Sequence, residues 1–63
     1  MTVVNGTHYE AAADETIADL VMEMIGRVEG VAVAVDGAVV PRSTWADTPV
    51  AGTIEIVTAA QGG

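Results

Sequence analysis

The residues of this sequence with the clearest chemical potential are Gly62 and Gly63 at its end. Two glycines remove all side-chain bulk and leave the backbone free, which does not help packing. These properties suit a tail that passes through a narrow channel of another protein and presents a carboxylate to a reaction centre. Fully extended, residues 60–63 would reach roughly 13–14 Å. We therefore expect Gly63 to supply the reactive carboxylate, with Gln61 and Gly62 in the inserted tail.

A terminal carboxylate has a limited chemistry. It is ionised at neutral pH and is a poor electrophile until it is activated, most simply as an acyl-adenylate. A sulfur donor would then give a thiocarboxylate, and an amine would give an amide. The residues by themselves leave both outcomes open. The sequence has no cysteine, so no side chain can carry a persulfide, form a disulfide or act as a thiol nucleophile.

Composition excludes several other functions. A length of 63 residues, 51% of them hydrophobic, predicts one small packed domain over 1–63 with a flexible tail at 60–63. The net charge of -7 makes nucleic acid a poor partner and favours a basic protein surface. No catalytic constellation and no set of metal ligands is visible. The first residues lack a signal peptide and no apolar run is long enough for a membrane span, so we expect a cytoplasmic protein that is monomeric when free.

One helix is predicted near the middle of the chain, over about Ile17 to Ile25. Thr16 is a good N-cap, Asp19 completes a capping-box pair with it, and Gly26 favours the end of the helix. One apolar stripe has helical spacing and is expected to face the core; it consists of Ile17, Leu20, Val21, Met24 and Ile25.

Strands are predicted on both sides of this helix. Asn5-Gly6 and Asp36-Gly37 are hairpin signals, and the first hairpin would continue with alternating residues over 7–11. Val31–Val35 places valines on one face and alanines on the other, and 53–59 is the last strand. Residues 42–52 are expected to be irregular. This order predicts the α+β class and a β-grasp, with a mixed sheet of four or five strands, one main helix on one face, and adjacent, parallel first and last strands.

Three segments of the chain make a family resemblance specific. They are Val31–Val35, the block Val40-Pro41-Arg42-Ser43-Thr44-Trp45, and the end from Ile54 through Gln61-Gly62-Gly63. With Val4-Asn5-Gly6 and the helix from Thr16, the chain closely resembles the thiamine-biosynthesis sulfur carrier proteins, which have the ubiquitin-like β-grasp fold.

The resemblance implies a carrier that is a substrate of enzymes and not itself an enzyme. An adenylating enzyme related to ubiquitin-activating enzymes would use ATP and magnesium to adenylate Gly63, and this chain itself would bind no cofactor. A desulfurase system would supply sulfur to form the thiocarboxylate, and thiazole synthase would accept it. The alternatives are a sulfur carrier of molybdopterin synthesis or a ubiquitin-like protein modifier. The short chain and the Val-Pro-Arg…Trp block favour the thiamine carrier.

Three residues and one loop have roles that the resemblance does not specify. Arg42 and Trp45 are possible members of a partner surface, although Trp45 is more readily explained as packing under the 42–52 segment. Asp36 stands where the family usually has Asn, a change that the turn should tolerate. The loop 50–53 looks shorter than usual, which affects one edge of a partner surface but not the tail.

Overall fold

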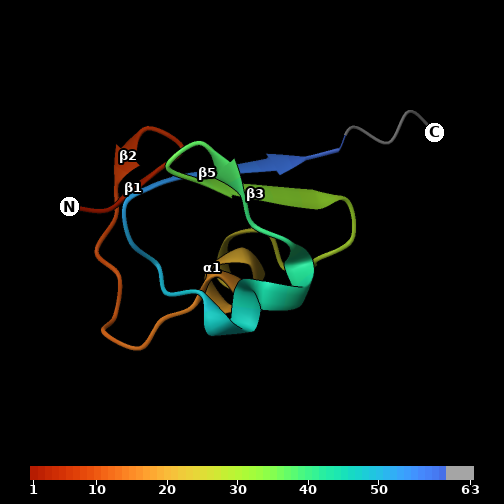
Figure 1. Cartoon of the computed structure of the whole chain (residues 1–63), viewed down its shortest axis with the longest axis horizontal. Coiled ribbons are helices and arrows are strands. Elements are labelled where there is room, and N and C mark those ends of the chain that lie inside the picture. The colour runs from red at the N-terminus through yellow and green to blue at the C-terminus, as the bar shows by residue number, and fades with distance from the viewer. Residues whose placement is uncertain (60–63) are drawn as a thin grey trace.

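Five strands form a single mixed sheet in the computed structural model, which describes residues 1–59 (Figure 1). The strands lie in the order β2-β1-β5-β3-β4, so the last strand of the chain is the central one. The predicted tail over 60–63 lies outside the described residues. The elements in chain order are β1 (Val3–Val4), β2 (Thr7–His8), α1 (Ile17–Met24), β3 (Val31–Val35), β4 (Ala38–Val39), the 3₁₀ helix η1 (Arg42–Asp47) and β5 (Thr53–Thr58).

The first and last strands are adjacent and parallel, as the sequence predicted. Val3 is paired with Thr53 and Val4 with Ile54, while β3 runs antiparallel to β5 on its other side. Helix α1 and η1 both lie on one face of the sheet (Figure 1). A mixed sheet with the two ends of the chain paired at its centre and one α-helix across it is a β-grasp, the ubiquitin-like fold, and the predicted fold class is confirmed.

Helix α1 begins and ends as its sequence signals indicate. The Thr16 side chain accepts a hydrogen bond from the Asp19 backbone N–H, and Asp19 Oδ2 accepts one from the Thr16 N–H. These two bonds satisfy donors that the first turn of a helix would otherwise leave unpaired. At the other end Gly26 has φ +85° and its N–H bonds back to the Val21 carbonyl. Met24 is the exception to the predicted stripe, because it is exposed.

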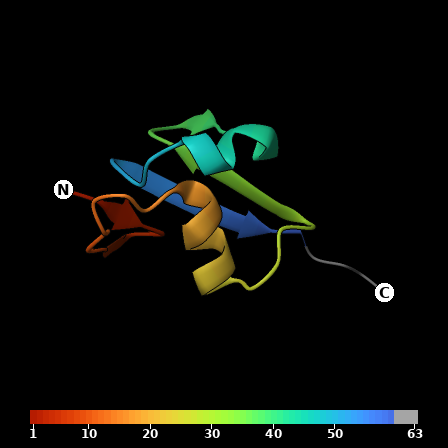
Figure 2. The ribbon, with the colours of Figure 1, turned by 90° about the horizontal axis from the view of Figure 1, so that it is seen from below.

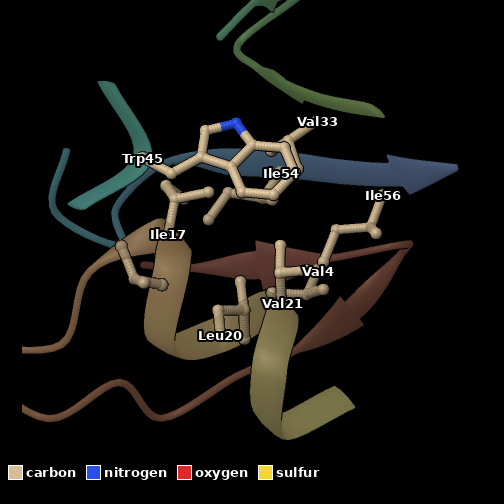
Figure 3. Packing of buried hydrophobic residues seen from close by; sticks show 9 residues of the cluster. Val4, Ile17, Leu20, Val21, Val33, Trp45, Ile54 and Ile56 are labelled. Atoms are coloured by element: carbon tan, nitrogen blue, oxygen red, sulfur yellow. The ribbon is translucent and has the colours of Figure 1, made fainter. Parts of the chain in front are cut away.

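The core lies between the sheet and α1, and Trp45 of η1 belongs to it (Figure 3). Ile17, Leu20 and Ile54 are fully buried, and none of the buried residues within 1–59 is polar or charged. Fully burying a residue of this size contributes roughly 1.5–3 kcal/mol. The core of the described residues consists of Val4, Ile17, Leu20, Val21, Val33, Trp45, Val50, Ile54 and Ile56.

Two predicted segments differ from the structure. The strand expected over 7–11 ends at His8. The Tyr9 N–H still bonds to the Thr2 carbonyl across the hairpin, and the Tyr9 hydroxyl bonds to Glu15 and Glu23. The segment expected to be irregular over 42–52 begins with η1. Its first turn is closed by a hydrogen bond from the Thr44 N–H to the Pro41 carbonyl, and so short a 3₁₀ helix has no helical periodicity for a sequence pattern to reveal. Among residues 1–59, no helix has the length and apolar character needed to cross a membrane.

Candidate functional site

Strand β5 forms the base from which the last residues of the chain leave the domain. It is the central strand, paired with β1 at its beginning and with β3 over Ile54–Thr58 (Figure 2). After Thr58 the ladder adds one further bond, from the Ala59 N–H to the Gly30 carbonyl at 2.6 Å. The chain is therefore held on the sheet as far as Ala59. The predicted site residues Gln61, Gly62 and Gly63 lie outside the described residues.

The face of the sheet opposite α1 is not covered by any described element (Figure 1). The register places the side chains of alternate residues on this face, and we call it the open face. Its members are Val3, His8, Ala32, Ala34, Val39, Thr53, Glu55 and Val57. Glu55 and Val57 belong to β5 and so lie on the same strand that leads to the tail.

The open face combines apolar side chains with an acidic group. Val39 is 75% exposed and Val57 is 61% exposed, while Ala32 opposite Val57 is too small to cover it. Exposed apolar groups gathered on one face are typical of a protein–protein contact surface. From the sequence, the last strand is predicted over 53–59, and neither Glu55 nor Val57 is assigned to a partner surface. The signal in the sequence that could have indicated such a surface was Val57, an apolar residue on the face of the strand opposite Ile54 and Ile56.

Trp45 is a core residue and not part of a partner surface. Its side chain is 2% exposed, and its ring lies across β5 beside Ile17 and Ile54 (Figure 3). The indole N–H donates a hydrogen bond of 2.9 Å to the Val40 carbonyl. This corrects the expectation that Trp45 could contact a partner. In a chain without phenylalanine, the Trp45 indole supplies a large apolar ring to the core.

Arg42 remains available as a surface cation. It is the first residue of η1 and is exposed. Among the described residues, no carboxylate lies within ion-pair distance of its guanidinium. Its role in partner binding stays a prediction.

The loop before β5 is closed by Asp36 of the β3–β4 turn. Asp36 has φ +50° in the β3–β4 turn, and its Oδ1 accepts a hydrogen bond of 2.9 Å from the Thr53 N–H. The Asp36 N–H also donates to the Thr53 carbonyl. Gly52 has φ +80°, and a Cβ on it would lie 2.8 Å from the Asp36 carboxylate oxygens, so glycine is required there. The carboxylate therefore ties the loop before β5 to the neighbouring turn.

Tyr9 connects the segment after β2 to helix α1. Its hydroxyl lies 2.7 Å from Glu15 Oε2 and 3.0 Å from Glu23 Oε1. A hydroxyl has one proton to donate, and removing that proton would place a phenolate beside two carboxylates. The hydrogen bond to Glu15, then desolvation and the bond to Glu23, raise the pKa of Tyr9 above its usual value.

We expect Tyr9, the single tyrosine of the chain, to ionise at a higher pH in the folded protein than in urea. Because the folded pKa is raised, stability from this contact should be complete below pH about 10 and be lost as pH rises through the folded pKa. An ultraviolet titration of the phenol in both states measures the shift. Glu15→Gln should move the folded titration to lower pH. Coincident folded and unfolded titrations would contradict the contact.

The β-grasp places this protein in the class of ubiquitin-like proteins, and Gly62-Gly63 follows its central strand in the sequence. The model of the ThiS family matches residues 2–63, and the chain belongs to this family. Proteins of the ThiS family are small sulfur carriers and not catalysts; they interact with activating enzymes related to ubiquitin-activating enzymes and with enzymes that accept the sulfur. A search of the curated proteins found no match.

Proposed function

We propose that this chain carries sulfur for thiamine biosynthesis, as a thiocarboxylate on Gly63. The observation that carries the proposal is the family match over residues 2–63, which includes the Gln61-Gly62-Gly63 end. The Val40-Pro41-Arg42…Trp45 block supports the thiamine branch of these carriers. Trp45 explains part of that block physically, because its indole N–H bonds to the Val40 carbonyl and its ring fills the core.

The first step activates the carboxylate. An adenylating enzyme that uses ATP and magnesium forms a bond between a Gly63 carboxylate oxygen and the α-phosphorus of ATP, and pyrophosphate leaves. The domain itself stays outside the enzyme and offers it the open face, where Val57 and Glu55 lie on the strand that continues into the tail. This chain binds no cofactor in the proposal; ATP and magnesium belong to the enzyme.

The second step replaces oxygen by sulfur. A persulfide of the desulfurase system attacks the carbonyl carbon of the adenylate, a C–S bond forms, and AMP leaves, which gives an acyl disulfide. A thiol of the same system then attacks the other sulfur of that S–S bond, so that a thiocarboxylate stays on Gly63 and the two enzyme sulfurs form a disulfide. Thiazole synthase then takes the sulfur. The absence of cysteine from the chain means that none of its side chains competes for sulfur transfer.

The experiment that tests this function follows the chain through both steps. ATP–pyrophosphate exchange with the cognate adenylating enzyme reports activation. Intact mass after addition of the desulfurase system should show a species heavier by the difference between sulfur and oxygen. Incubation of that species with thiazole synthase, and separately with the large subunit of molybdopterin synthase, identifies the acceptor. Sulfur transfer to the second enzyme alone would replace the thiamine assignment, and amide-linked conjugates would favour a protein modifier.

We expect Gly62→Val to lower the rate of activation by about 100-fold, because a displacement of reacting groups by about 1 Å has effects of that size. Valine adds a branched side chain and restricts the backbone of a segment that must pass through a narrow channel. The exchange assay measures the rate, and a melting curve checks the fold. Gly62→Ala adds one methyl group and should have a smaller effect. Activation of Gly62→Val at the parent rate would show that the channel does not select for glycine.

A further inference from the structure

The edge of β5 that faces β1 is only half occupied. Antiparallel pairing with β3 uses the backbone groups of Val57 and Glu55, because the bonds of Ala59 to Gly30 and of Asp36 to Thr53 fix which residues face β3. The alternate residues Ile54, Ile56 and Thr58 therefore direct their N–H and carbonyl groups toward β1.

Strand β1 fills the beginning of this edge in a regular series. The Val3 N–H donates to the Gly52 carbonyl at 3.0 Å, and the Asn5 N–H donates to the Ile54 carbonyl at 2.9 Å. In a parallel ladder the same β1 residue would next offer its own carbonyl to the following N–H of β5. At Asn5 the backbone has already turned, with φ +50° before Gly6 at +83°. The Asn5 side-chain Oδ1 takes over and accepts the Ile56 N–H at 2.8 Å.

After Val3 and Asn5, no described residue occupies the next pairing position along this edge of β5. A residue of a parallel neighbouring strand at that position would bond both the Ile56 carbonyl and the Thr58 N–H. No described backbone or side-chain group is hydrogen-bonded to the Thr58 N–H. Thr58 is exposed, and the β1–β2 hairpin lies at the other end of β5 (Figure 2). The edge thus begins where Asn5 ends the ladder and continues to the base of the tail.

We propose that an extended segment of the adenylating enzyme binds at this edge as an added strand, accepting the Thr58 N–H and donating to the Ile56 carbonyl. Addition of a strand to a free sheet edge is a common way to bind an extended partner through main-chain hydrogen bonds. This edge leads directly into residues 60–63, so a strand paired with it aligns the tail with the enzyme's channel. The inference rests on the proposed function, because it concerns the enzyme that activates Gly63.

The variant Thr58→Pro tests the contribution of the Thr58 backbone N–H to binding of the enzyme. Proline removes the N–H that faces the empty position and leaves the β3–β5 ladder intact, since that ladder does not use the Thr58 N–H. Thr58→Ala is the matched control, because it removes the side chain and keeps the N–H. We expect Thr58→Pro to bind the adenylating enzyme about tenfold to 100-fold more weakly than the parent, and Thr58→Ala to bind like the parent.

Amide hydrogen exchange gives a second measurement that needs no variant. In the complex of the parent chain with the enzyme, the Thr58 amide should become protected by at least about tenfold relative to the free chain. Equal binding of Thr58→Pro and parent, or an unprotected Thr58 amide in the complex, would overturn the proposal. So would protection of Thr58 in the chain alone together with a dimeric mass, because a second copy would then occupy the edge. If the parent supports no ATP–pyrophosphate exchange, the proposed function fails instead.

Discussion

Deletion of Gly63 should abolish activation and leave the domain folded. The new terminal carboxylate would fall short by one residue, about 3.3–3.6 Å, which takes it out of reach of the α-phosphorus of ATP. Exchange of pyrophosphate into ATP should fall by more than about 100-fold. The free energy of unfolding should change by less than about 0.5 kcal/mol, because a glycine at the end of the chain has no side chain to pack.

Activation requires both the full length of the tail and an ionised carboxylate, and a chain amidated at Gly63 tests the second requirement alone. This chain keeps the length of the parent and lacks the ionised carboxylate, so it should also fail to be activated. Thermal melts of the three chains should coincide. Full activation of the shortened chain would place the reaction elsewhere in the protein and would remove the basis of the carrier function.

Replacement of Trp45 by alanine should unfold a large part of the protein. Truncation of a buried tryptophan costs about 3–5 kcal/mol, and a domain of 63 residues has a total stability of roughly 3–9 kcal/mol. Trp45 is 2% exposed and packs against Ile17 and Ile54, so little can move in to fill the space. The melting temperature should fall by more than about 15 °C.

Two variants define the origin of that loss. Trp45→Phe keeps most of the apolar volume and removes the hydrogen bond to the Val40 carbonyl, so its effect should be clearly smaller. Ser43→Ala, at an exposed position of the same 3₁₀ helix, should change stability by less than about 0.5 kcal/mol. A Trp45→Ala chain that melts like the parent would show that the ring is not part of the core.

Much of the fold could be predicted because its signals are local. The capping box of Thr16 and Asp19 lies within one turn of helix, and Asp36-Gly37 determines its own turn through positive φ angles. The alternation in Val31–Val35 predicted one valine face and one alanine face, and the structure places the valine face against the core. The pairing of β1 with β5 followed from the order of the elements, because a strand that returns over one helix pairs beside the first strand.

The sequence therefore predicted the helix, the approximate positions of the strands, the fold class and the chemically distinctive Gly62-Gly63 end, but not η1. The contacts between distant residues depend on the tertiary structure. The side-chain oxygen of Asn5 accepts a hydrogen bond from the Ile56 N–H, 51 positions away in the sequence. The Asp36 carboxylate accepts one from the Thr53 N–H, 17 positions away. Neither pairing has a local signature, because each side chain reaches its backbone partner only after the sheet has formed. Only then does β5 carry both a covered beginning and a free edge at Thr58, next to the tail.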